Sequence, residues 1–290
     1  MKKPIKQWTC VITGGTSGVG LSVAGGMARK GAAVVLCGRN SSTGNRIVRQ
    51  LEKETGNGNI EFQTLDLSSL NNIRQCADSL KRRYSTLELL SNNAAVLQMQ
   101  PEITENGIEK IFQVNYLGHF LFTMLLLDRL KEDQGGRIIT VSGSPSVLRF
   151  GKLDTEDLDS RNKFNFFKAT LRAAYAKVAF SHTLSRLLNP KQVTSNTFHP
   201  GVIKSNLGRN LPLFLQWSLN LVESFLPRYS KTALYAAASE DLDNVSGAFI
   251  AGQRIVRFKP AYDLDYYADF LWQKSLELTG VENQEFKNSR

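Results

Sequence analysis

The sequence predicts a doubly wound α/β fold, in which a parallel sheet is covered by helices on both faces, and three observations predict it. Strand-like apolar runs alternate with amphipathic helical stretches along most of the chain. The runs Val34–Leu36 and Ile138–Ile139 are apolar throughout, as in strands buried on both faces. A glycine-rich turn follows the first strand. The length of 290 residues, with 42% apolar content, suits a single domain spanning 1–290.

Each expected element follows from the period of its apolar residues. Strands are placed at short apolar runs between turn residues, and helices where apolar residues recur every three to four positions. The expected strands are Thr9–Thr13, Ala33–Cys37, Ile60–Leu65, Leu87–Asn92, Arg137–Val141 and Val193–Phe198. The expected helices are Leu21–Lys30, Asn45–Thr55, Leu70–Tyr84, a long stretch from about Gly107 to Glu132, and one near Ala173–Leu188.

The net charge of +10 fits a polyanionic partner, an anionic membrane surface or an anionic cofactor. The basic residues are dispersed and are not interleaved with aromatic residues, so we do not expect nucleic-acid binding. The three cysteines and three histidines lack the spacing of metal ligands. We therefore expect buried reduced thiols and no metal site.

Two features of the chain bear on its location. No stretch reaches the ~20 uninterrupted apolar residues of a membrane-spanning helix. Residues Met1–Lys6 lead directly into a strand without the apolar core of a secretory signal. We expect a cytoplasmic protein, and both peripheral membrane contact and a homodimer stay open.

The glycine-rich turn, Thr13 to Gly20, predicts a nucleotide site. Gly14 allows the chain to reverse after the strand, Gly18 allows the backbone to approach a pyrophosphate, and Gly20 allows the next helix to pack closely. The start of that helix presents unpaired N–H groups and a positive dipole end to the phosphates. The residues expected to contact the cofactor here are Gly14, Thr16, Ser17, Gly18, Val19 and Gly20.

The end of the second strand indicates which dinucleotide is bound. An acidic residue there would accept a hydrogen bond from the ribose 2′-hydroxyl, but Cys37 to Asn40 contains no acid. Arg39 could hold a 2′-phosphate, which favours NADP(H); the alternative is that Arg39 is a solvated loop residue. Asp66, beside Leu67, could accept from the adenine amino group or could cap the helix that begins at Leu70.

Three motifs carry a resemblance to the short-chain dehydrogenase/reductase family, whose members have a Rossmann fold. They are Thr13-Gly14-x-x-x-Gly18-x-Gly20, Asn92-Asn93-Ala94-Ala95 and Pro200-Gly201. The resemblance spans nearly the whole chain and implies NADP(H) contacts at Asn93, Ala94, Lys177, Pro200, Gly201 and Ile203, besides those named above.

Four further segments are most similar to the branch that holds retinol dehydrogenases and light-dependent protochlorophyllide reductases. They are Val114–Phe120, His199–Val202, Val245–Gly247 and Leu276–Gly280. Because those relatives reduce hydrophobic substrates with NADPH, the resemblance implies a hydrophobic small-molecule substrate and an oxidoreductase.

The same resemblance implies catalytic positions, which this chain matches unequally. Asn115 is in place as the residue that holds a proton-relay water. An ungapped match puts Gly143 at the position of the substrate-binding serine, with Ser144 as the nearest substitute. Lys177 matches the family lysine, which binds the nicotinamide ribose and lowers the pKa of the acid.

The family tyrosine lies four residues before its lysine, but here Ala173 occupies that position and Tyr175 lies only two before Lys177. Positions two apart on a helix point about 200° apart. In one hypothesis the helix has an irregular first turn, so that Tyr175 reaches the site and ordinary carbonyl reduction survives. In a second, another donor such as substrate, water, Ser144 or Tyr116 supplies the proton, on a C=C or C=N bond among others. In a third, the chain is a non-redox, NADP(H)-binding scaffold or sensor.

A strongly apolar segment, Leu211–Pro227, follows the Pro200-Gly201 loop. We expect it to form a lid, about 204–228, over a hydrophobic substrate, because loops at the carboxyl ends of parallel strands form the ligand crevice. A helix packed on the core or on a dimer partner is the alternative.

Overall fold

A computed structural model of the chain describes residues 3–132, 135–150, 153–204, 226–227, 229–260 and 262–282. Its centre is an eight-stranded sheet in the order β3-β2-β1-β4-β5-β6-β7-β8, in which every pairing is parallel except β7 with β8. The strands are β1 (Thr9–Thr13), β2 (Ala33–Gly38), β3 (Ile60–Thr64), β4 (Leu89–Asn92), β5 (Gly136–Val141), β6 (Val193–His199), β7 (Phe249–Ala251) and β8 (Arg254–Val256). The predicted doubly wound α/β fold is confirmed.

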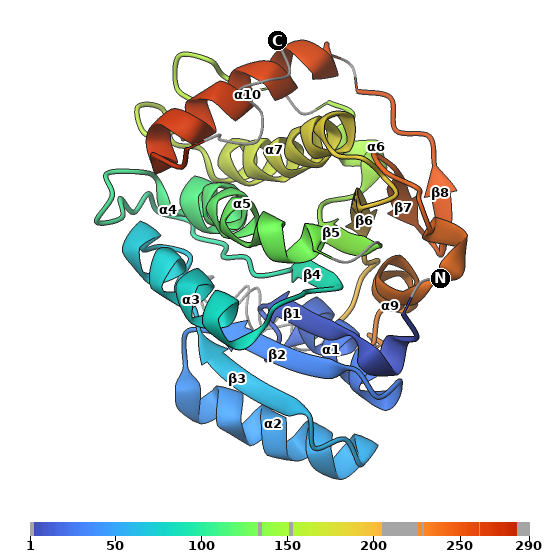
Figure 1. Ribbon diagram of the computed structural model, residues 1–290. Coiled ribbons are helices and arrows are strands. Elements are labelled where there is room, and N and C mark those ends of the chain that lie inside the picture. Colours follow the sequence, from blue (N-terminus) through green and yellow to red (C-terminus); the bar gives the residue numbers. More distant parts are fainter. Residues whose placement is uncertain are drawn as a thin grey trace.

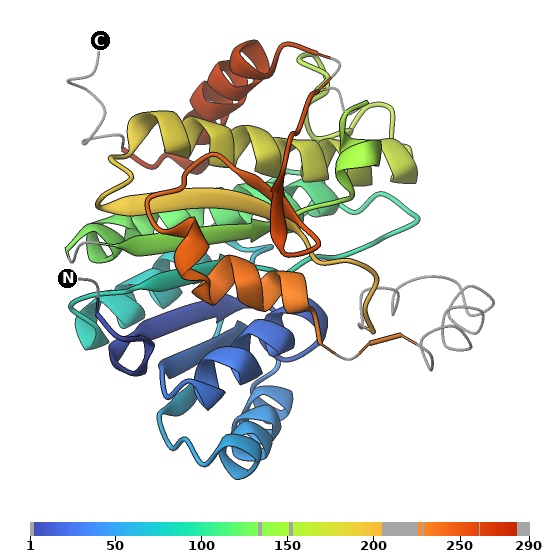
Figure 2. The same cartoon turned by 90° about the vertical axis from the view of Figure 1, so that its right-hand side faces the viewer.

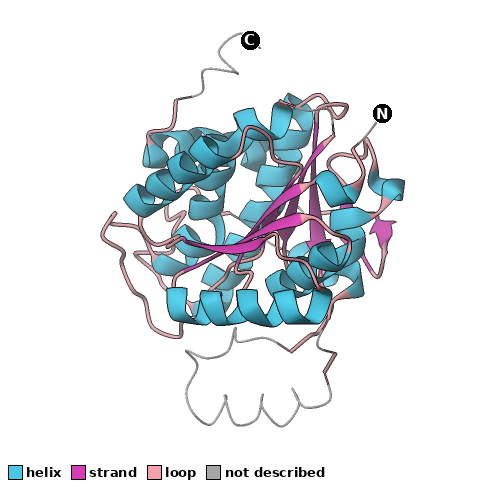
Figure 3. Cartoon of the chain, turned by 60° about the horizontal axis from the view of Figure 1, so that its bottom comes forward, coloured by secondary structure: helices cyan, strands magenta, loops and turns pink. Residues whose placement is uncertain are grey.

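Helices cover both faces of this twisted sheet (Figure 1; Figure 3). One face carries α1 (Gly18–Arg29), α2 (Ser41–Thr55) and α9 (Lys231–Ala238). The other carries α3 (Leu70–Arg83), α5 (Gly118–Lys131) and α7 (Phe166–Leu187), with α10 (Leu264–Thr279) lying over α7 (Figure 2). Short elements are η1 (Ile5–Gln7), α4 (Lys110–Phe112), η2 (Gln113–Leu117), α6 (Pro145–Leu148) and η4 (Glu240–Leu242).

Two predicted helices differ from the structure in ways that affect the site. The stretch expected from about Gly107 to Glu132 divides into α4, the π-helical turn η2 and α5. Helix α7 begins at Phe166 and not near Ala173, because the Asn165 side chain caps it by accepting a hydrogen bond from the Lys168 backbone N–H at 3.1 Å. Tyr175 and Lys177 therefore lie well inside a regular helix.

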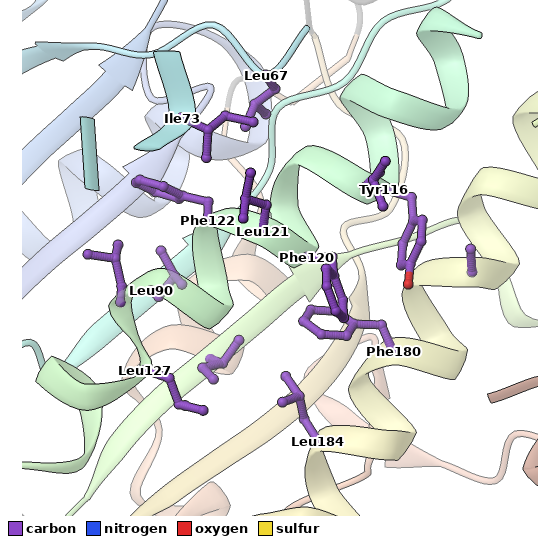
Figure 4. Close-up of a cluster of buried hydrophobic side chains, with 14 of the residues drawn as sticks. Leu67, Ile73, Leu90, Tyr116, Phe120, Leu121, Phe122, Leu127, Phe180 and Leu184 are labelled. Atoms are coloured by element: carbon purple, nitrogen blue, oxygen red, sulfur yellow. The ribbon is translucent and has the colours of Figure 1, made fainter. Parts of the chain in front are cut away.

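The larger core cluster lies between the sheet and the α3–α5–α7 face. Figure 4 shows Tyr116, Phe120 and Phe180 packed together within it. The Tyr116 hydroxyl lies 2.7 Å from Ser275 Oγ on α10, and burial raises the pKa of Tyr116 well above its usual range. Among the described helices, Lys110–Lys131 is apolar and long enough to cross a membrane, but 83% of its most apolar window is buried in this core.

Candidate active site

A cavity of about 1070 Å³ lies at the carboxyl ends of the parallel strands. Its walls come from the glycine-rich turn after β1, the segments after β2 to β5, the first half of α7 and the loop after β6. It brings together every residue expected to bind the cofactor: Gly14, Thr16, Ser17, Gly18, Val19, Gly20, Arg39, Asp66, Leu67, Asn93, Ala94, Lys177, Pro200, Gly201 and Ile203. Of the four expected catalytic residues, Asn115 and Lys177 line it, whereas Ser144 and Tyr175 do not.

The glycine-rich turn has the backbone geometry that its sequence predicts. Gly14 and Gly18 have φ angles of 64° and 53°, in the left-handed region that favours glycine. A Cβ atom on Gly20 would lie 2.4 Å from the Gly14 carbonyl oxygen. Ser17 stands at the N-cap of α1, but its side chain makes no capping hydrogen bond. The first-turn N–H groups of α1 therefore form a cradle that fits a phosphate.

The residues after β2 and β3 also line the cavity. Arg39 is exposed there, and Arg46 also lines the cavity. Asp66 does not cap α3: the cap is Ser69, whose hydroxyl accepts from the Asn72 N–H at 3.3 Å. The Asp66 carboxylate instead accepts hydrogen bonds from the backbone N–H and the hydroxyl of Ser68, at 2.9 and 2.6 Å.

A buried hydrogen-bond network beneath the cavity centres on Thr13. The Thr13 hydroxyl accepts from the backbone N–H groups of Asn93 and Ala94, at 2.9 and 3.1 Å. It also lies 2.9 Å from His119 Nε2, and His119 Nδ1 lies 3.3 Å from the Asn115 carbonyl oxygen. Burial, with the nearby Lys177 charge, lowers the pKa of His119 to about 3. The neutral ring can then donate from Nδ1 and accept at Nε2, which makes His119 a structural residue.

Two asparagines define the floor of the cavity. The Asn115 side chain accepts from the Val96 N–H at 2.7 Å and donates to the Val96 carbonyl at 3.0 Å. The Asn93 amide nitrogen donates to the Ser91 carbonyl and hydroxyl oxygens, but the buried Asn93 Oδ1 has no partner among the residues that the structure describes. An unpaired buried acceptor in a cavity wall indicates a ligand with a donor group, and with the amide cradle it fits a dinucleotide.

Lys177 is 5% exposed and lines the cavity. Within the part of the chain that the structure describes, its ammonium group has no hydrogen-bond partner and no ion pair. Burial lowers the pKa of Lys177 from 10.5 to about 8. An unpaired ammonium with such a pKa is poised to bind or protonate a ligand in the cavity.

Tyr175 points to the opposite side of α7. Its ring is fully buried and meets Tyr267 of α10 edge to face, with the ring centroids 6.3 Å apart. Its hydroxyl has no hydrogen-bond partner in the described part of the chain, and burial, with nearby Tyr267 and Asp263, raises the pKa of Tyr175 to about 12. The irregular first turn that would bring Tyr175 to the site is absent from this regular helix. Because helix periodicity separates Tyr175 from Lys177, we do not retain Tyr175 as a catalytic residue.

Ser144 is also displaced from the cavity. Its Oγ lies 2.7 Å from Ser146 Oγ at the start of α6, while Ser142 and Gly143 line the cavity in its place. The Ser142 hydroxyl donates to the Ala174 carbonyl at 2.8 Å, so it is already engaged. Tyr116 is likewise enclosed in the core. We therefore retain neither Ser144 nor Tyr116 as a proton donor.

Sequence reasoning missed Thr170 and Ala174, which line the cavity with Lys177. The signal was available, because positions i, i+4 and i+7 share one face of a helix. The start expected for this helix excluded Thr170. Most of the expected lid, Leu211–Pro227, lies outside the described residues; the described ends of this region meet where the Lys204 N–H donates to the Pro227 carbonyl at 3.1 Å.

Comparisons with known proteins agree with this architecture. The profile of a family described as short chain dehydrogenase matches residues 9–151. Human polyprenol dehydrogenase is 33% identical over 292 residues, covering 96% of this chain and 87% of that protein. Mouse retinol dehydrogenase 13 is 34% identical over 289 residues, covering 97% and 86%.

Solved structures share the fold. An uncharacterised protein from Mycobacterium paratuberculosis superposes with a TM-score of 0.72 at 28% identity, covering 95% of this chain and 94% of that one. A short chain dehydrogenase from Shigella flexneri complexed with NADP has a TM-score of 0.66 at 20% identity, covering 87% and 100%.

Proposed function

This chain belongs to the short-chain dehydrogenase family, and we propose that it is an NADP(H)-dependent oxidoreductase that acts on a hydrophobic substrate. The substrate would be a carbonyl or alcohol, or would carry a C=C or C=N bond. The observation that carries the proposal is one cavity that joins the phosphate cradle, Arg39 and the unpaired Lys177.

The proposed cofactor rests on the chemistry of the cavity wall. The start of α1 would hold the pyrophosphate, and the unpaired Asn93 Oδ1 would accept from a donor group of the cofactor. Arg39, with no acid at the end of β2, would bind a 2′-phosphate. The Shigella flexneri relative in complex with NADP supports this choice. When bound, NADP(H) would supply or accept the hydride.

The proton donor is proposed to be Lys177. Gly143 and Ala173 stand where the family resemblance implies hydroxyl groups, so neither position has a proton to give. Of the lining residues around the end of β5 and the start of α7, Lys177 alone is ionisable. Its pKa of about 8 is close to neutral pH, where a general acid is most effective. Asn115 would position water beside it.

The proposed substrate is an apolar alcohol or aldehyde. Relatives named polyprenol dehydrogenase and retinol dehydrogenase support this class. The cavity wall also contains apolar side chains, among them Val96 and Leu97 from the segment after β4 and Val202 and Ile203 from the loop after β6. We propose that the protein is cytoplasmic. Peripheral membrane contact and a homodimer are two further hypotheses to be tested.

The test is NADPH oxidation with all-trans-retinal and farnesal, and with an apolar enone and an apolar imine for C=C and C=N chemistry. We expect NADPH to bind tightly and at least one apolar substrate to be reduced. When the cofactor is deuterated at C4, the deuterium should appear in the product. Failure of NADPH to bind would overturn the proposal.

A second candidate function is a non-redox, NADP(H)-binding scaffold or sensor. The loss of both hydroxyl positions, at Gly143 and Ala173, favours it. The scaffold or sensor hypothesis predicts tight NADPH binding and no hydride transfer to the aldehydes, the enone or the imine. It also predicts that the Lys177→Met variant binds these compounds with the same affinity as the wild-type protein.

A further inference from the structure

Thr170 of α7 combines two properties that point to a ligand. It lines the cavity, and its hydroxyl oxygen is buried and has no hydrogen-bond partner among the described residues. Buried hydroxyl groups in proteins are nearly always paired, so an unpaired one in a cavity wall calls for an explanation.

Other helical threonines of this chain show what the ordinary arrangement would be. The hydroxyls of Thr55, Thr183 and Thr279 each donate to the carbonyl four residues earlier in their own helix. Thr183 lies in the same helix as Thr170, with its hydroxyl 3.2 Å from the Ala179 carbonyl. Within the described residues the Thr170 hydroxyl makes no such bond to its own helix. Rotation about χ1 can therefore turn it toward a partner in the cavity without breaking a hydrogen bond.

Thr170 shares a face of α7 with Ala174 and Lys177, and all three line the cavity. Seven residues span about 10.5 Å along a helix, and helical side chains lean toward the N-terminus, so Lys177 leans toward Thr170. The residue between them on this face is Ala174, and Gly143 stands in the β5 loop that also lines the cavity. Small residues thus leave room for a ligand between the Thr170 hydroxyl and the Lys177 ammonium.

We propose that the Thr170 hydroxyl donates a hydrogen bond to the oxygen of the substrate, and so holds an apolar alcohol or aldehyde beside Lys177. This inference rests on the proposed function, because it names the residue that binds the substrate in the same site. It assigns to Thr170 the recognition of the substrate oxygen, for which neither Gly143 nor Ala173 has a hydroxyl group.

The test measures binding, and it does not require turnover. Farnesol and a hydrocarbon of the same chain without the hydroxyl group are titrated calorimetrically into the NADPH complex, in which a reduced cofactor and an alcohol cannot react. The variants are Thr170→Val, which keeps the shape, and Thr170→Ser, which keeps the hydroxyl. Thr183→Val is the matched control, because its hydroxyl lies in the same helix but outside the cavity wall.

We expect the wild-type protein to prefer farnesol over the hydrocarbon. Thr170→Val should weaken farnesol binding about fivefold to tenfold, as for a lost hydrogen bond, with hydrocarbon and NADPH affinities unchanged. Thr170→Ser and Thr183→Val should retain the preference.

The inference would be overturned if the wild-type and Thr170→Val proteins showed the same preference for farnesol over the hydrocarbon. It would also be overturned if the wild-type protein did not prefer farnesol. A Thr170-dependent preference in a protein that never oxidises NADPH would support Thr170 as the binding residue and refute the proposed reaction.

Discussion

The Lys177→Met variant should be more stable than the wild-type protein, because the folded state buries an unpaired ammonium group. The pKa of Lys177 falls from 10.5 to about 8 on burial, and at about 1.4 kcal/mol per unit the charged side chain costs roughly 3 kcal/mol. Methionine fills a similar volume without the charge. We expect the free energy of unfolding at pH 7, measured by urea denaturation without cofactor, to rise by about 2 to 3 kcal/mol.

The pH dependence of this difference has a definite sign. Below pH 8 Lys177 is charged in both the folded and the unfolded protein, so the cost of burial is present in full. Between pH 8 and 10.5 the folded protein loses this proton before the unfolded protein does, and the cost shrinks. The stability gap between variant and wild type should therefore narrow over this range. Other groups that titrate there, such as Tyr175, cancel in the comparison.

A gap that stays constant from pH 7 to 10.5, or a variant less stable than the wild type at pH 7, would refute this reasoning. The same variant should lose NADPH-dependent activity while remaining folded, which separates the functional role of Lys177 from its effect on stability.

Three further predictions concern the cavity and the tyrosine outside it. Tyr175→Phe should leave NADPH oxidation within about twofold of wild type in a steady-state assay and should not lower the melting temperature, because its hydroxyl is unpaired and outside the cavity; a large loss of activity would contradict this. Arg39→Ala should weaken NADPH binding roughly 10- to 100-fold in a fluorescence titration and leave NADH binding unchanged; an equal effect on both cofactors would count against the 2′-phosphate contact. Gly20→Ala should abolish NADPH binding in the same titration, because its Cβ would lie 2.4 Å from the Gly14 carbonyl oxygen; wild-type affinity would show that the cradle is not used.

Much of the fold and of the cofactor site could be predicted because both depend on local patterns. Strand and helix periods gave the central sheet, and the glycine-rich turn lies within a single strand-turn-helix unit. Residues that directly follow parallel strands, such as Arg39 after β2 and Asn93 after β4, lie together at the carboxyl ends of the strands because of the topology alone. That is why every residue expected to bind the cofactor lines one cavity.

The catalytic half depends on the exact start of α7 and on tertiary contacts, which the period of the apolar residues alone does not determine. The start of α7 is set by the Asn165 cap, and this start determines that Tyr175 faces α10 and that Thr170 faces the cavity. The missing partner of the Thr170 hydroxyl is a property of the tertiary structure and has no sequence signal. Ser144 directly follows Gly143 in the sequence, but its hydroxyl lies beside Ser146 Oγ and it does not line the cavity.

The pH dependence of apolar aldehyde reduction, compared between the wild-type and Tyr175→Phe proteins, tests the central claim most directly. A general acid must be protonated, so with Lys177 as the donor the rate should be constant at low pH and fall about tenfold per unit above about pH 8. The two proteins should give the same profile. A rate that stays constant well above pH 8 in the wild type and disappears in Tyr175→Phe would contradict the account, because it would identify Tyr175, with its pKa of about 12, as the acid.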